Sequence, residues 1–320
     1  MKPNKYASLF PGQGSQYHGM LSGAYERFPA VRETFNEASE AIGIDLWALT
    51  KKDNNSSINL TENTQPLLLS SSVALWREFI KSDVTPPAIL AGHSLGEFSA
   101  LVCAESLEFA DAVVLVRNRG RYMQEAVPVG TGAMAAILGL EENKVDSICA
   151  ECTSKRNDGL SVNAVNYNSP AQVVIAGHSE AVDEAIDALK EAGAKRAMLL
   201  PVSAPFHTPL MSSAGDRLAI SMEDITFKEP KIAVLSNVTA DIQSDPEQIK
   251  KLLVKQISSP VNWTGCIQFI VKKGIKHALE FGPGSVLTGL CRRIDKSLIC
   301  NSLEHPDSLS SAVKVIVQND

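Results

Sequence analysis

The chain has 320 residues, of which 44% are hydrophobic and 21% charged, and its formal net charge is −6. This length suits one large domain with an insertion, or two domains. The acidic balance argues against general nucleic-acid binding, which needs a basic surface, and two short basic runs near 272–276 and 292–296 are typical of solvated faces. No apolar stretch approaches the roughly 20 residues of a membrane span or forms a signal-peptide core. We therefore expect a cytoplasmic protein without nucleic-acid or membrane partners.

The six cysteines are scattered along the chain, and only Cys149 and Cys152 have the C-x-x-C spacing. Neither a second pair nor a histidine cluster completes the usual set of metal ligands. The sequence therefore predicts free thiols in a reducing compartment, with no metal and no cofactor.

The first half of the chain alternates short apolar runs with longer helical patterns. A strand is expected at 6–10, followed by a glycine-rich loop at 11–16. Helical patterns follow at 22–42, 64–81 and 109–127, and a short apolar run at 88–91 reads as a second buried strand.

The most informative segment is Gly92-His93-Ser94-Leu95-Gly96, which fits the G-x-S-x-G nucleophile elbow. Glycines on both sides of the serine permit a tight strand-to-helix turn that exposes the hydroxyl. The helical pattern at 97–103 would aim its N-terminal N–H groups toward a developing oxyanion. By itself the motif is also compatible with an ordinary turn whose serine caps a helix.

The middle of the chain has a different order of predicted elements. Strand and helix patterns alternate as βαββαβ, which is the ferredoxin-like arrangement. These patterns lie at 132–140, 141–152, 160–167, 172–176, 179–191 and 195–200, the helix at 179–191 being well capped. We expect a small subdomain at 130–203 inserted into a larger α/β core made of 1–129 and 204–320. In the last part, strands are expected at 232–235 and 277–281, with helices at 245–256 and after 263.

A serine hydroxyl is a poor nucleophile unless a base takes its proton. His93 is adjacent in sequence, but neighbouring side chains at an elbow point apart, which makes it a pocket wall. His207 lies in a proline-bracketed loop that returns from the insertion, where a side chain can be aimed. The remaining histidines, at 18, 178, 277 and 305, lie in polar segments. His207 is the candidate base, with a structural loop histidine as the alternative.

Six blocks of sequence, in order and with similar spacing, resemble the malonyl-CoA:acyl-carrier-protein transacylases. The resemblance runs from about 6 to 295. The blocks are 9–16, 92–97, 119–124, 166–170, 205–207 and 280–284, which read LFPGQGSQ, GHSLGE, RGRYMQ, NYNSP, PFH and EFGPG. The resemblance implies an α/β-hydrolase-like core with a parallel sheet, and transfer of malonyl from malonyl-CoA to the phosphopantetheine thiol of an acyl carrier protein. Fatty-acid and polyketide synthesis remain open as the pathway, and a monomer is expected.

The resemblance also assigns roles to individual residues. Ser94 would be acylated, His207 would be its base, and the main-chain carbonyl of Gln256 would orient the histidine. The N–H groups of Gln13 and Leu95 would form the oxyanion hole. The other implied positions contact substrate: Arg119 on the malonyl carboxylate, Asn168 and Gln172 along the pantetheine arm, and Phe206 against an α-methyl group, which would disfavour methylmalonyl.

Elementary chemistry is consistent with these roles, because arginine binds a carboxylate through a planar, always charged fork. Three arginines on one helix would otherwise be a solvated face, and only the resemblance selects Arg119. Two alternatives stay open. One is an esterase or thioesterase with water as acceptor, although no acid occupies the usual Ser…Asp…His place. The other is a non-enzymatic scaffold, which would be expected to have lost Ser94, His207 or Arg119.

Overall fold

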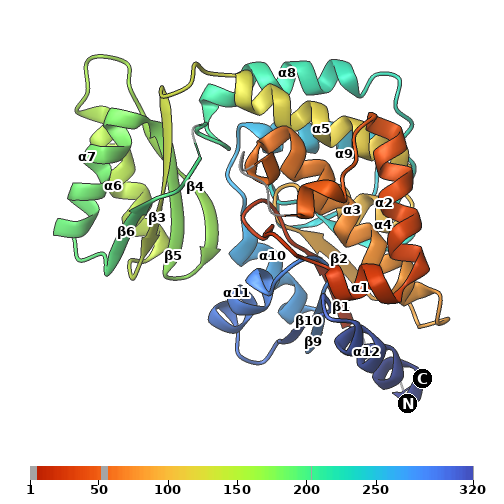
Figure 1. The fold of residues 1–320 in the computed structure, drawn as a ribbon. Coiled ribbons are helices and arrows are strands. Elements are labelled where there is room, and N and C mark those ends of the chain that lie inside the picture. Colours follow the sequence, from red (N-terminus) through yellow and green to blue (C-terminus); the bar gives the residue numbers. More distant parts are fainter. Residues whose placement is uncertain (1–5, 52–56, 203, 320) are drawn as a thin grey trace.

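The computed structural model describes residues 6–51, 57–202 and 204–319, and Figure 1 shows two β-sheets with helices packed around them. Residues 1–5, 52–56, 203 and 320 lie outside the described part, including the expected boundary at 203. The fold is mixed α/β, with a central, mostly parallel sheet and a separate antiparallel sheet. This agrees with the α/β class predicted from the sequence.

The central sheet has the strand order β10-β9-β1-β2-β7-β8, and all neighbours are parallel except β7 and β8. Its strands are β1 (Tyr6–Phe10), β2 (Ile89–Gly92), β7 (Ala233–Leu235), β8 (Ile242–Gln243), β9 (His277–Glu280) and β10 (Ile299–Ser302). Every residue of β1 and β2 is buried, as expected for parallel strands covered on both faces. The carboxyl ends of β1 and β2 consequently meet at one edge of the sheet.

Helices cover both faces of this sheet. Tyr6 and Phe10 of β1 join one apolar core, whereas Ala7 and Leu9 join another on the opposite face. The first core includes residues of α2 (Pro29–Ile42), α3 (Thr61–Ile80), α4 (Gly96–Cys103), α5 (Phe109–Glu125), α8 (Ser212–Ser221), α9 (Pro246–Ile257) and α12 (Pro306–Asn319). The second includes residues of α10 (Trp263–Lys272) and α11 (Val286–Ile294).

The helical pattern predicted at 22–42 is two helices rather than one. The chain forms α1 (Ser22–Arg27), breaks at Phe28, and starts α2 at Pro29. Proline lacks an N–H and clashes with a helical preceding residue, so it starts a helix more readily than it continues one. Phe28 accordingly has the extended dihedrals φ −111° and ψ 117°.

The second sheet is antiparallel and has the order β4-β5-β3-β6. Its elements follow one another as β3 (Gly132–Leu138), α6 (Glu142–Ser154), β4 (Val162–Ser169), β5 (Gln172–His178), α7 (Ser179–Glu191) and β6 (Arg196–Leu199). One face packs on α6 and α7, and from the other face Met134, Val174 and Ala176 join the first core of the central sheet. The helix α7 has no side-chain cap at its start, because Ser179 Oγ donates to Gly130 O, and the chain leaves the helix through Gly193 with φ 101°.

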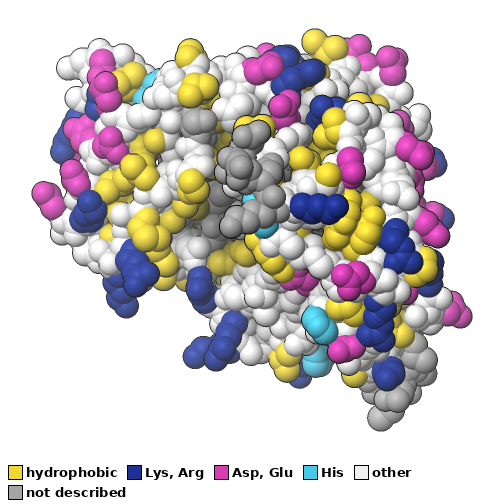
Figure 2. All heavy atoms as spheres, in the orientation of Figure 1, with side chains coloured by type: hydrophobic (Ala, Val, Ile, Leu, Met, Phe, Trp, Pro, Cys, Tyr) yellow, Lys and Arg dark blue, Asp and Glu magenta, His cyan; other side chains and the backbone are white. Residues whose placement is uncertain are grey.

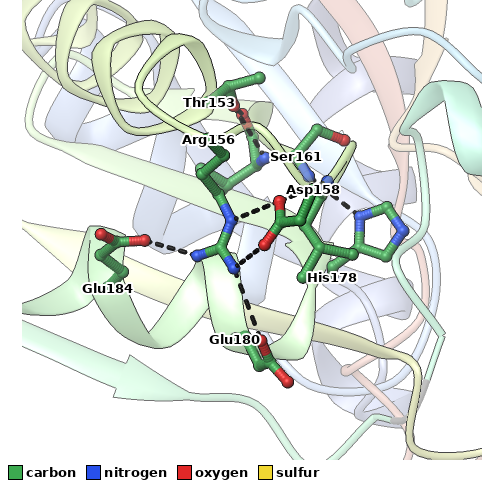
Figure 3. A network of polar contacts seen from close by, with 9 residues as sticks. Thr153, Arg156, Asp158, Ser161, His178, Glu180 and Glu184 are labelled. Atoms are coloured by element: carbon green, nitrogen blue, oxygen red, sulfur yellow. Dashed lines mark hydrogen bonds and ion pairs between the residues drawn. The ribbon is translucent and has the colours of Figure 1, made fainter.

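A network of charged side chains joins the loop after α6 to the first turns of α7 (Figure 3). Arg156 lies in the loop after α6 and pairs with Asp158 at 2.6 Å, Glu184 at 2.6 Å and Glu180 at 3.5 Å, the last two on α7. The bond from Arg156 lowers the pKa of Asp158 to about 2. Next to it, His178 accepts a hydrogen bond from Ser161 N. Because these carboxylates are exposed, the network contributes local order more than stability.

Candidate active site

Ser94 lies at the turn between β2 and α4, at the carboxyl edge of the central sheet. Its φ is 50°, a left-handed conformation that non-glycine residues rarely adopt. A Cβ on Gly92 would lie 1.8 Å from Gly96 C, and one on Gly96 would lie 2.1 Å from Phe10 O. Both glycines are therefore needed for space, and the turn they allow presents the Ser94 hydroxyl at the edge of the sheet.

His207 reaches Ser94 from the loop after β6. Its Nε2 lies 2.9 Å from Ser94 Oγ, and its Nδ1 lies 2.8 Å from the main-chain carbonyl oxygen of Gln256. A carbonyl only accepts, so Nδ1 carries the proton and Nε2 is left as the acceptor for the serine hydroxyl. His207 itself has φ 64° and is 4% exposed, so its backbone is held in a strained, buried conformation.

The surroundings keep His207 neutral. Burial and the nearby charge of Arg119 lower the pKa of its imidazole to about 3, although the Gln256 carbonyl acts in the opposite direction. A neutral imidazole beside a serine hydroxyl can accept its proton at neutral pH. The pair therefore has the protonation state that a nucleophile and its base require.

Arg119 of α5 is buried beside the nucleophile, 1% exposed. It donates from Nη1 to Gln65 Oε1 at 2.8 Å, and from Nη2 to Gln256 Oε1 at 2.9 Å and Ser94 Oγ at 3.2 Å. Burial lowers the pKa of this guanidinium to about 10, so it stays charged at neutral pH. Its hydrogen-bond acceptors are all neutral, and within the described ranges no carboxylate lies in ion-pair distance of it. The site thus holds a buried cation that can accept an anionic ligand.

Two main-chain N–H groups lie in the segments that meet at Ser94. Leu95 is the N-cap residue of α4. Gln13 belongs to the loop after β1, and Phe10 at the end of that strand accepts a hydrogen bond from His93 N. Among the described residues, neither the Leu95 N–H nor the Gln13 N–H has an acceptor. Both N–H groups are therefore available to donate to a ligand.

The remaining predicted substrate residues are Phe206, Asn168 and Gln172. Phe206 is 8% exposed and packs in the first core next to His207. Asn168, at the end of β4, has its Oδ1 2.7 Å from His93 Nε2. Gln172 is not in contact with the Ser94 cluster and instead accepts a hydrogen bond from Arg293.

A basic groove surrounds Gln172. It has a volume of about 800 Å³ and is lined by the β4–β5 hairpin and by α11. Its cationic side chains are Lys195, Arg292, Arg293 and Lys296. Figure 2 shows Lys and Arg side chains gathered over α11 and the adjacent end of the small sheet. One of the two basic runs that the sequence suggested to be a solvated face therefore lines a groove.

The chain matches the family described as "Acyl transferase domain" over residues 8–305. It is 50% identical over 309 residues to the malonyl CoA-acyl carrier protein transacylase of Salmonella typhimurium, covering 97% of this chain and 99% of that protein. The chain belongs to the malonyl CoA-acyl carrier protein transacylase family. It is accordingly an acyltransferase.

Solved structures of this family have the same fold. The transacylase of Coxiella burnetii superposes with a TM-score of 0.95 at 44% identity, covering 98% of each chain. A malonyl-transacylase solved in complex with a type II PKS acyl-carrier protein superposes with a TM-score of 0.94 at 47% identity, covering 97% of this chain and 99% of that one.

Several residues that hold Ser94 and its neighbours in place carried no recognisable signal in the sequence. Asn237, after β7, accepts from Ser94 N at 2.7 Å and donates from Nδ2 to Gly92 O at 2.7 Å. Glu97 and Gln65 are buried partners of Gln256 and Arg119, and neither was singled out. For Glu97 and Gln65 the only indication was polar character inside apolar helical patterns, whereas Asn237 follows a short apolar strand pattern.

Two kinds of feature do not occur in the described ranges. No group of three or more histidine, cysteine or acidic side chains there is arranged to hold a metal ion. Within the same ranges, no helix combines the length and the hydrophobicity needed to cross a membrane.

Proposed function

We propose that this chain transfers the malonyl group of malonyl-CoA to the phosphopantetheine thiol of an acyl carrier protein, through an ester on Ser94. Its relatives carry this activity in their names, and one of them was solved with an acyl-carrier protein. The observation that carries the proposal is the buried Arg119 in contact with Ser94 Oγ. A plain serine esterase has no use for a cation there.

In the first step, Ser94 Oγ attacks the thioester carbonyl of malonyl-CoA while His207 Nε2 accepts the hydroxyl proton. The N–H groups of Gln13 and Leu95 stabilise the oxyanion of the tetrahedral intermediate. The carbon–sulfur bond then breaks, CoA leaves as a thiol with the proton from His207, and the malonyl ester remains on Ser94. The Gln256 carbonyl keeps the imidazole in the required tautomer throughout.

The second step runs the same chemistry in reverse with another thiol. His207 takes the proton of the phosphopantetheine thiol, whose sulfur attacks the ester carbonyl, and the proton then returns to Ser94 Oγ as the ester bond breaks. The carrier gains a malonyl thioester and the enzyme is regenerated. No electrons change hands, so neither a redox cofactor nor a metal is part of this scheme.

The pantetheine arm would run along the small sheet. Asn168 contacts His93 beside the nucleophile, and the same strand continues into the hairpin that lines the basic groove. We place the phosphates of CoA, or the acidic surface around a carrier's phosphopantetheine, at this groove because its four cationic side chains suit anions. Asn168 and Gln172 would mark the two ends of the path.

Phe206 would set the acyl group that fits. Its ring is adjacent to the base and packed in the core, so it has little room to move. An α-methyl branch on the malonyl group would collide with it, which makes methylmalonyl-CoA a poor substrate.

Finer features of the fold belong to the same proposal. The central sheet with its elbow would be an α/β-hydrolase-like core of residues 1–129 and 204–320, and the sheet order β4-β5-β3-β6 favours a ferredoxin-like subdomain at 130–203. We further propose that the protein acts as a cytoplasmic monomer.

Substitution of Arg119 tests the proposal against a generic serine hydrolase. In Arg119→Ala, the malonyl carboxylate would be buried without a partner, so kcat/KM for malonyl-CoA should fall by about 100-fold or more. Acetyl-CoA has no carboxylate that would lose its partner, so its kcat/KM should change less. The ratio of kcat/KM for malonyl-CoA over acetyl-CoA should therefore fall in Arg119→Ala. Arg121→Ala, on the same helix but exposed, is the matched control and should keep the wild-type ratio. An unchanged ratio in Arg119→Ala would remove the main support for malonyl as the acyl group.

The alternative function is hydrolysis, with water as the acceptor. It is distinguished by measuring malonate release from malonyl-CoA with and without holo acyl carrier protein. The proposal expects slow release without the carrier, and malonyl-carrier formation that exceeds free malonate when it is present. Malonate released at the same rate in both mixtures would favour the hydrolase.

A further inference from the structure

Glu97 is a fully buried carboxyl group on α4, three residues after the nucleophile Ser94. It is the second residue of α4, is 0% exposed, and forms no ion pair with any described residue. Its Oε1 accepts from Gln243 Nε2 at 2.8 Å. Its Oε2 accepts from Asn237 N at 3.0 Å and from Gln256 Nε2 at 2.7 Å. The mechanism above makes no use of this group.

The orientation of the Gln256 amide follows from its two neighbours. Arg119 can only donate, so the oxygen of the amide must face Arg119 and its NH₂ must face Glu97. The main-chain N–H of Asn237 is also an obligate donor. Glu97 Oε2 therefore receives two donors that cannot reverse, which leaves no room for a proton on that oxygen.

Gln256 contacts both His207 and Arg119. Its main-chain carbonyl holds Nδ1 of His207, and its side-chain oxygen holds Nη2 of Arg119. Glu97 supplies the acceptor at 2.7 Å that fixes the NH₂ end of the amide, whereas Ser94 O at 3.2 Å and Asn237 Oδ1 at 3.4 Å are longer contacts. A shift of this amide would therefore move Arg119 relative to Ser94 Oγ.

We propose that Glu97 is a positioning residue, which acts through Gln256 to hold Arg119 in place for the acyl carboxylate and His207 in place for the serine. The inference rests on the proposed function, since it gives Arg119 and His207 the roles argued above. What it adds is that the reach of the Glu97 side chain matters more than its charge. Its hydrogen-bond partners are neutral N–H donors, and burial raises the pKa of this carboxyl, with the charge of Arg119 the weakest of the opposing effects.

Two conservative variants separate reach from charge. Glu97→Gln keeps the length of the side chain, and its amide oxygen can take the place of Oε2. Its NH₂ group would then face Gln243, whose Oε1 is buried without a partner in the described structure and can turn to accept it. Glu97→Asp keeps the charge but withdraws the carboxylate by about 1.5 Å, one carbon–carbon bond, so the bond to Gln256 is lost.

Two quantities are measured for each variant. The first is the ratio of kcat/KM for malonyl-CoA over acetyl-CoA, which reports on Arg119. The second is the rate of Ser94 modification by phenylmethylsulfonyl fluoride, a neutral reagent that reports on the serine and its base. In Glu97→Asp we expect the ratio to fall by about tenfold or more and the modification to slow, because displacements near 1 Å have effects of this size. In Glu97→Gln both should stay within about threefold of wild type.

Glu280 offers a matched control. It is also a buried acid, 0% exposed, at the end of β9, where it accepts from the N–H groups of Leu287 and Thr288 at the start of α11. Glu280→Asp should lower thermal stability without changing the malonyl-to-acetyl ratio, as expected for a purely structural carboxylate.

The opposite order, with Glu97→Asp active and Glu97→Gln impaired, would overturn the proposal in favour of a role for the charge. If Glu97→Asp keeps the wild-type ratio of kcat/KM for malonyl-CoA over acetyl-CoA, Glu97 has only a structural role, like Glu280. Failure of the proposed function itself is distinct, because it would appear as the absence of a malonyl adduct on the wild-type protein.

Discussion

Ser94→Ala should gain no malonyl group when it is incubated with malonyl-CoA, whereas the wild-type protein should gain one. The hydroxyl is the nucleophile in contact with a neutral imidazole, and alanine removes the only atom that can carry the ester there. The measurement is the intact mass of both proteins after mixing with excess malonyl-CoA. The fold should survive, because alanine is smaller than serine and fits the same space.

Ser99→Ala is the control for this experiment. Ser99 lies on the same helix α4, is buried, and its hydroxyl has no partner among the described residues, so its loss breaks no hydrogen bond. This variant should be acylated like the wild type. A malonyl adduct on Ser94→Ala at wild-type occupancy would move the nucleophile elsewhere.

His207→Ala should acylate slower than the wild type by about 10²–10⁴-fold, because an unassisted serine hydroxyl is nearly inert at neutral pH. The rate is measured by following the malonyl adduct in a rapid-mixing experiment. His18→Ala, at an exposed position near α1, is the matched control and should keep the wild-type rate. A loss of less than tenfold in His207→Ala would assign the base to another group, with His93 the next candidate.

The pH dependence of acylation follows from the burial of the same imidazole. In solution a histidine is protonated below its ordinary pKa of 6.5, but in this site the pKa is lowered to about 3. Protonation removes the base, so kcat/KM should stay level as the pH falls through 6.5 and should decline only as it approaches the lowered value. The unfolded chain still binds this proton near pH 6.5, so His207 costs stability progressively as the pH falls below 6.5.

The sequence indicated the parts of the site that local patterns encode. The elbow at 92–96 is a local pattern, since the space around Gly92 and Gly96 leaves room for little else. The proline-bracketed loop likewise singled out His207. Both depend on steric rules that act over a few residues, and both residues lie together in the structure.

The buried polar residues that support Ser94 and Arg119 could not be predicted from local patterns. Glu97 of α4, Asn237 after β7 and Gln256 of α9 come together only in the folded chain, and of the three only Gln256 had a role implied by the family resemblance. A buried glutamate near the start of an apolar helix is indistinguishable in sequence from a favourable helix-terminal charge. The strand β10 and the helix α12 were missed for a related reason, because their half-buried patterns are weak outside their tertiary context.

The central claim is that a malonyl group passes from CoA to a carrier protein through Ser94, and one measurement tests it directly. The wild-type protein is mixed with malonyl-CoA, freed of excess substrate, and then mixed with holo acyl carrier protein while the intact masses of both proteins are followed. We predict that the enzyme first gains one malonyl group and then loses it as the carrier gains one. An adduct that disappears equally fast without the carrier, or a carrier that never gains the malonyl mass, would contradict the account.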